Sequence, residues 1–147
     1  MTEPGVIGIA QIEEEIIEEF ALFDDWMDKY EHIISLGKEL PLIEDSLKSD
    51  DLLIKGCQSR VWLHAKIDGD KVVYTADSDA IITKGVISLL IRVLSKQTPD
   101  TIVNTDLLFI EQIGLKEHLS PTRSNGLVSM VKQMKLYALA FKTQQQG

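Results

Sequence analysis

Apolar residues in the first quarter of the chain recur at helical spacing. Between positions 9 and 27 they fall at alternating intervals of three and four, which places them on one face of a helix. Glutamates at 13–19 fill the opposite face, and we interpret them as a solvated surface rather than a docking site for a basic partner. The aspartate pair at 24–25 can begin a second helix, which stops at Gly37. Residues 1–8 carry no such pattern and are predicted to be frayed.

The middle of the chain predicts a β-hairpin. Residues 60–67 alternate between apolar and polar, as in a half-buried strand. Asp68 and Gly69 then give a strong turn signal because glycine tolerates positive φ, and residues 72–75 return as a second strand. The short apolar run at 52–54 could form a further strand. The inward face of the first strand is predicted to carry Val61, Leu63, Ala65 and Ile67.

Helical spacing returns after the hairpin. Ser78 or Asp79 can cap a helix whose apolar positions run from 82 to 94, and Thr98 followed by proline can cap another. Residues 119–126 are rich in turn formers and predict a loop, followed by a last helix from about Leu127. The glutamines at 144–146 are predicted to be disordered. Helices on both sides of a hairpin indicate an α+β fold in one domain over residues 1–147, with an ordered core from about 9 to 142.

Charge and composition exclude several functions. The formal net charge of −8 would repel a phosphate backbone, and no basic cluster offsets it, so nucleic-acid binding is not expected. An anionic membrane surface is disfavoured for the same reason, and no apolar run is long enough to span a bilayer. A single cysteine cannot form an internal disulfide, and the first residues resemble no secretion signal, so we expect a cytoplasmic location.

The one cysteine, Cys57, is the strongest candidate for chemistry. Glycine and small polar residues flank it, and the thiol falls at a junction of loop and strand, where reactive groups are often displayed. Lys55 and Arg60 bracket it, and either cation would stabilise the thiolate if it pointed at the sulfur. A small buried hydrophobe remains the alternative interpretation. No phosphate-binding glycine motif is present, and one cysteine with three scattered histidines predicts no metal site.

Three blocks of sequence resemble the signature of the SufE-type sulfur-acceptor family, the cysteine desulfuration proteins of iron–sulfur cluster assembly. The resemblance extends from about Ile12 to Phe141, and the blocks stand in the expected order and separation. Residues 23–30 also resemble the family's opening helices. The blocks are Gly56-Cys57-Gln58-Ser59-Arg60-Val61-Trp62, Ala76-Asp77-Ser78-Asp79-Ala80-Ile81-Ile82-Thr83-Lys84-Gly85 and His118-Leu119-Ser120-Pro121-Thr122-Arg123-Ser124-Asn125-Gly126-Leu127.

This resemblance implies a fold and a function. The fold would be a SufE/NifU-like three-stranded antiparallel sheet with helices on one face, the third strand being residues 52–54. Cys57 would accept persulfide sulfur from a cysteine desulfurase and pass it to a cluster scaffold, and clearing the desulfurase would stimulate it. Pyridoxal phosphate would belong to that partner, with no cofactor or metal on this chain. The resemblance leaves open whether the chain forms a homodimer.

Supporting roles around the thiol follow from the same blocks. Arg123 is the candidate for stabilising the thiolate or holding the cysteine loop, and Gly56 would let that loop move. Asp79 is interpreted as a helix cap that positions the loop, whereas Gln58 and Arg60 flank the sulfur. Two other hypotheses stay open: a stand-alone thiol enzyme that reduces peroxide or hydrolyses esters, and an adaptor in which the cysteine is incidental.

Overall fold

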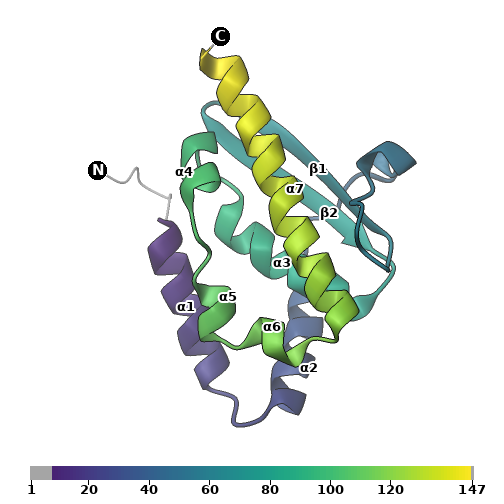
Figure 1. Ribbon diagram of the computed structural model, residues 1–147, viewed down its shortest axis with the longest axis vertical. Helices are drawn as coiled ribbons and strands as arrows, with labels where there is room; N and C mark the ends of the chain where they lie inside the picture. The colour runs from purple at the N-terminus through teal and green to yellow at the C-terminus, as the bar shows by residue number, and fades with distance from the viewer. Residues whose placement is uncertain (1–7, 147) are drawn as a thin grey trace.

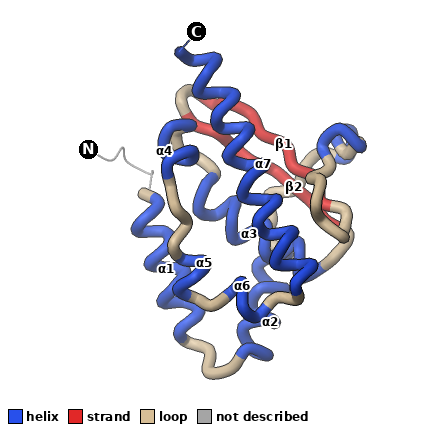
Figure 2. The backbone as a smooth tube through the Cα atoms, in the orientation of Figure 1, coloured by secondary structure: helices blue, strands red, loops and turns tan. Residues whose placement is uncertain are grey.

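A two-stranded antiparallel hairpin lies against a group of helices in the computed structural model, which describes residues 8–146 (Figure 1, Figure 2). Strand β1 (Val61–Asp68) pairs with β2 (Lys71–Ser78), with Val61 opposite Ser78 and Asp68 opposite Lys71. Gly69 has a φ of +63°, as the turn signal required. The hairpin is therefore confirmed. The alternation of β1 holds for Val61 and Leu63, which are fully buried, but it does not extend to Ile67, which is 38% exposed near the turn.

Residues 52–54 do not form a strand, so the prediction of a three-stranded sheet is wrong. Among the described residues the sheet has two strands. Leu53 makes one isolated bridge to Trp62, and the backbone N–H of Ile54 donates to the carbonyl of Val61 at 2.8 Å. Pairing goes no further because a 3₁₀ turn, η2 (Asp50–Leu52), precedes it and Gly56 turns the chain away at a φ of +91°. The α+β class itself is confirmed.

The two N-terminal helices follow the predicted pattern with one exception. Helix α1 (Ile9–Ala21) buries its apolar stripe, and α2 (Trp26–Gly37) begins at an N-cap, Asp25, whose carboxylate accepts from the N–H of Asp28 at 2.9 Å. The stripe does not continue to Met27, which is 74% exposed, because α1 ends at Ala21. A 3₁₀ turn, η1 (Asp45–Leu47), follows α2.

The glutamates of α1 are not all solvated. The carboxylate of Glu13 accepts from the N–H of Phe109 at 2.8 Å, and Glu19 pairs with Arg92 at 3.0 Å. Two members of the acidic face therefore tie α1 to later parts of the chain, whereas Glu14, Glu15 and Glu18 are exposed as expected.

Helix α3 (Ile81–Leu94) is the centre of the core and buries residues on most of its circumference. It crosses α2 closely, because a Cβ placed on Gly85 would lie 2.1 Å from the carbonyl oxygen of Ile33. Only glycine permits this approach. The remaining short helices are α4 (Pro99–Asn104), which has the predicted Thr98 cap, α5 (Phe109–Gln112) and α6 (Leu115–His118).

Helix α7 (Pro121–Gln146) crosses in front of the hairpin in Figure 1 and begins six residues before the predicted start. The prediction of a loop at 119–126 is wrong over most of its length. Ser120 caps α7, since its hydroxyl accepts from the N–H of Arg123 at 3.3 Å, and Pro121 occupies the first helical position. Helix α7 continues through the glutamines at 144–146, where the sequence predicted disorder, because glutamine sustains a helix and no glycine or proline stands between Gly126 and Gly147.

The core joins all these layers. Buried residues of α1, α3, α7 and the inner face of the hairpin form one hydrophobic cluster. The hydroxyl of Tyr74 on β2 donates to the carbonyl of Met134 on α7 at 2.6 Å, so the helix is fixed to the hairpin by a buried hydrogen bond. Across residues 8–146, no helix combines the length and the apolar character that crossing a membrane requires. The predicted fraying of residues 1–8 lies outside the described residues, apart from Gly8.

Candidate functional site around Cys57

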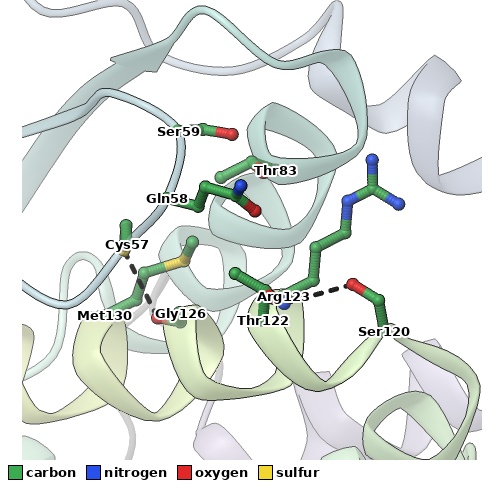
Figure 3. Close-up of a pocket in the computed structure, with 9 residues that line it drawn as sticks. All are labelled: Cys57, Gln58, Ser59, Thr83, Ser120, Thr122, Arg123, Gly126 and Met130. Carbon is green, nitrogen blue, oxygen red and sulfur yellow. Dashed lines mark hydrogen bonds between the residues drawn. The ribbon is translucent and has the colours of Figure 1, made fainter.

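Cys57 lies in a short loop directly before β1, as the sequence predicted. The loop is anchored at both ends, by the hydrogen bond from Ile54 to Val61 on one side and by Arg60 on the other. The thiol is half-buried and packs against the edge of the hydrophobic core. Its Sγ lies 3.7 Å from the carbonyl oxygen of Gly126 on α7, within reach of a weak S–H hydrogen bond (Figure 3).

Two glycines let the cysteine loop lie on α7. Gly56 has positive φ, and a Cβ placed there would lie 2.4 Å from the hydroxyl oxygen of Ser129, so a larger residue would push the loop away from the helix. Gly126 lies under the thiol, where a Cβ would contact Sγ at 3.5 Å. The loop thus rests on the helix surface at both positions. The prediction that Gly56 permits motion of the loop remains a prediction.

A cleft of about 210 Å³ opens beside the thiol. Its walls come from the cysteine loop, the first turn of α3, and the first turns of α7 (Figure 3). Most of the side chains that line it are hydroxyls or amides. The lining residues are Cys57, Gln58, Ser59, Thr83, Ser120, Thr122, Arg123, Gly126 and Met130.

Burial governs the acidity of the thiol. Desolvation raises the pKa of Cys57 above its ordinary value, because a partly buried thiolate would lose hydration. The cations that bracket it in sequence do not offset this effect: Lys55 and Arg60 are both exposed, and neither lines the cleft. In this conformation burial therefore favours the protonated thiol of Cys57 over the thiolate.

Arg123 does line the cleft, but it does not touch the sulfur. Its side chain leaves α7 and carries the guanidinium to the end of the cleft away from Cys57 (Figure 3). Gln58 also lines the cleft and lies between the two in this view. The predicted role of Arg123 in stabilising the thiolate remains a prediction, and the structure gives it a rigid base on a helix rather than the expected loop.

Asp79 does not cap α3. The N-cap position belongs to Ala80, and no side chain caps this helix. The carboxylate of Asp79 instead accepts from the backbone N–H of Arg60 at 3.1 Å, and the N–H of Asp79 donates back to the carbonyl of Arg60 at 3.2 Å. This reciprocal pair fastens the end of the cysteine loop to the end of β2. Asp79 therefore does hold the cysteine loop, as predicted, but through hydrogen bonds to Arg60 rather than by capping a helix.

Sequence reasoning misses several residues of the site. Thr83 and Gly126 belong to the resembling blocks but have no role assigned from them, and Ser129 and Met130 lie outside the blocks. Thr83 could have been found, because it is a polar residue in the first turn of a helix whose neighbouring positions are mostly apolar. The contacts of Gly126 and Ser129 with the loop join residues about 70 positions apart, so no local sequence pattern predicts them.

The cleft offers little to the other interpretations of Cys57. Its lining includes no histidine and no carboxylate that could act as a general base for hydrolysis. In the part of the chain that the structure describes, no three His, Cys, Asp or Glu side chains are grouped closely enough to hold a metal ion.

Comparison with known proteins assigns the family. The model of the SufE family, described as an Fe–S metabolism associated domain, matches residues 14–138. The chain belongs to the SufE family. Two SufE-like proteins that are themselves uncharacterised agree: one from Rhizobium meliloti is 36% identical over 127 residues, covering 83% of this chain and 91% of the relative, and one from Rhizobium etli is 37% identical over 127 residues, covering 83% and 86%.

The fold has a solved counterpart. A hypothetical protein from Thermus thermophilus, determined in solution, superposes with a TM-score of 0.75 at 19% identity, covering 90% of this chain and 96% of that one. This similarity concerns the fold alone. Membership of the SufE family links the chain to Fe–S metabolism, and all three blocks that carried the sequence resemblance lie within the matched residues.

Proposed function

We propose that this SufE-family chain is a sulfur acceptor. A pyridoxal-phosphate-dependent cysteine desulfurase carries a persulfide, and Cys57 takes its outer sulfur. The Cys57 thiolate attacks that sulfur, a new S–S bond forms on Cys57, and the desulfurase cysteine leaves as a thiolate, ready for another turnover. Cys57 then passes the sulfur to an iron–sulfur cluster scaffold. The desulfurase is stimulated because its own cysteine is cleared.

One observation carries the proposal: the only thiol of a SufE-family chain lies on a surface loop at the side of a cleft. The resting geometry also suits a carrier. Contact with Gly126 and partial burial cover part of the sulfur, which would slow the loss of a persulfide to water. Because burial raises the pKa of Cys57, less of the thiol is ionised in this conformation, and a partner that docks and exposes the loop would favour the attacking thiolate.

The test is transfer from a purified desulfurase. The full chain is incubated with the desulfurase and free cysteine, and its intact mass and the desulfurase turnover are recorded. We expect a gain of sulfur atoms and faster turnover, both lost in Cys57→Ser and in wild-type protein whose thiol has been alkylated. A Ser46→Ala variant, exposed and outside the cleft, serves as the matched control.

Two outcomes would contradict the proposal. Full stimulation by Cys57→Ser would make the chain an adaptor with an incidental cysteine. Turnover of peroxide or esters by the isolated chain, with no transfer from a desulfurase, would make it a thiol enzyme.

A further inference from the structure

A second hollow, the α7 groove, lies along α7 on the side that faces α5 and α6 (Figure 1). Its volume is about 310 Å³, and it shares no lining residue with the cleft beside Cys57, so a molecule bound in one leaves the other open. Part of its apolar lining is open to solvent, with Val128 48% exposed. The apolar residues that line the groove are Leu107, Ile110, Leu127, Val128 and Val131.

The wall opposite α7 is held in an unusual conformation. Leu107 has a φ of +52°, which a residue of its size rarely adopts, and its side chain is nevertheless buried. The N–H of Leu107 donates to the hydroxyl of Thr105 at 3.4 Å, and the carbonyl of Thr105 accepts from Nζ of Lys135 on α7. Contacts within the chain therefore fix the shape of the groove, and an apolar partner would meet a wall that is already formed.

The charge around this groove is opposite to that of the whole chain. Three lysines, Lys116, Lys132 and Lys135, line it against one carboxylate, Asp106, whereas the chain carries a formal net charge of −8. Lys116 and Lys132 are exposed, and neither makes an ion pair with any residue that the structure describes. An acidic group brought to the groove would therefore meet two cations without having to displace a carboxylate from either.

We propose that the α7 groove is a docking site for an acidic amphipathic helix of a partner protein. The apolar face of that helix packs into the groove, and its carboxylates lie against Lys116 and Lys132. A helix fits better than an extended segment, because the lining comes from helices and their connections and offers no strand edge for pairing. This interaction goes beyond the proposed function, because it is a second contact surface that does not include Cys57.

A flat anionic membrane surface suits this groove less well than a peptide does. Lipid head groups would meet the same lysines, but they would also meet Asp106 and a chain whose net charge repels them. A single helix can place its carboxylates on the lysines alone and its apolar side chains in the hollow.

Binding is tested with a fluorescently labelled synthetic helical peptide that carries leucines on one face and glutamates on the other. The peptide is titrated with the full chain and followed by anisotropy. We expect saturable binding that weakens as salt is added, whereas a peptide with lysines in place of the glutamates should not bind. Failure of the wild type to bind the acidic peptide, or equal binding of the two peptides, would overturn the proposal.

Charge reversal locates the peptide. The double variant Lys116→Glu, Lys132→Glu should bind it at least tenfold more weakly, since each change turns an attraction into a repulsion. The matched control, Lys38→Glu with Lys66→Glu, makes the same change in net charge at exposed lysines outside the groove and should stay within about twofold of the wild type. An equal loss in the two double variants would indicate non-specific attraction and overturn the assignment of the groove.

Two single variants test the lining. Asp106→Asn removes its one carboxylate and should strengthen binding about twofold, a gain that misfolding cannot produce. Val128→Thr keeps the shape of an exposed side chain but makes it polar, and it should weaken binding about fourfold. Unchanged affinity in either variant would place the peptide outside the groove.

The last measurements separate this surface from the thiol and from lipid. Cys57→Ser should bind the acidic peptide as the wild type does, and Lys116→Glu with Lys132→Glu should still gain sulfur from a desulfurase. Loss of loading in the double variant would assign the groove to the desulfurase and overturn a separate partner. Co-sedimentation of the full chain with phosphatidylglycerol vesicles, without peptide binding, would make the groove a lipid contact instead. Peptide binding by a wild type that no desulfurase loads would sustain this inference and overturn the proposed function.

Discussion

The thiol of Cys57 rests on the backbone of Gly126, with Sγ 3.7 Å from its carbonyl oxygen. This contact joins the cysteine loop to α7, the longest helix that the structure describes. Gly126 stands in the second turn of that helix, and a Cβ there would meet Sγ at 3.5 Å, so alanine, the better helix former, would also fit.

A substitution at residue 126 should displace the thiol only when the new side chain is larger than that of alanine. Gly126→Ala adds a Cβ at ordinary contact distance, 3.5 Å from Sγ, so we expect an unchanged fold and a gain of up to about 1 kcal/mol in unfolding free energy. Gly126→Leu should displace the loop and speed alkylation of Cys57 by a neutral reagent. Alkylation measured against Val128→Leu, an exposed neighbour on α7, controls for general loosening. Equal rates in Gly126→Leu and wild type would show that the thiol does not depend on this contact.

Gly56 should tolerate no side chain. Gly56→Ala imposes positive φ on alanine and places its Cβ 2.4 Å from the Ser129 hydroxyl, and we expect a loss of about 2 kcal/mol or more in urea unfolding. The double variant with Ser129→Ala should recover part of the loss, because it removes the clashing oxygen and leaves the backbone strain. Complete recovery would assign the whole cost to the clash, and no recovery would assign it to the backbone.

Removing the acceptor at position 79 should loosen the loop. Asp79→Ala loses the hydrogen bond to the N–H of Arg60, with an expected cost of about 1 kcal/mol and faster alkylation of Cys57. Asp79→Asn keeps an acceptor oxygen and should lose less in both measurements. If the alanine variant retained wild-type protection of the loop amides in hydrogen exchange, Asp79 would not be an anchor.

The thiol should make stability depend on alkaline pH. The folded pKa of Cys57 is raised by burial, so the folded state holds this proton longer than the unfolded chain does. The stabilisation is complete below the ordinary thiol pKa of about 8.5 and is lost as the pH rises through the folded pKa. The difference in unfolding free energy between wild type and Cys57→Ser should therefore stay constant below about pH 8.5 and shift against the wild type as the pH rises above it. Parallel curves would contradict the raised pKa.

Local signals predicted most of the fold because most of its elements carry their own evidence. The stripe of α1, the caps at Asp25 and Thr98 and the turn at Gly69 could all be recognised within a few residues. The start of α7 could not, because Gly126 is typical of a turn until the cysteine loop is seen resting on it. The prediction of a third strand failed for a related reason. The apolar run at 52–54 indicates that these residues are buried, but the turn at Gly56 prevents them from pairing further with β1.

The sequence likewise predicts some features of the candidate site and not others. Cys57 could be found from its uniqueness and its polar neighbours, and Gln58 and Arg123 from the resembling blocks. The acidity of the thiol could not, since Lys55 and Arg60 adjoin it in sequence and yet do not line its cleft. The direction of the pKa shift follows from burial, which is a property of the assembled core rather than of the neighbouring residues.

The two anchors of the cysteine loop set a limit on the distance the sulfur can travel. Cys57 is three residues from Ile54 and three from Arg60, and a fully extended chain spans at most about 3.5 Å per residue. With both anchors intact, its backbone can move no further than about 10 Å from either one. The cysteine loop is therefore too short to carry the sulfur into a deep tunnel in another protein. Under the proposed function, the desulfurase would therefore have to bring its persulfide to the rim of this cleft.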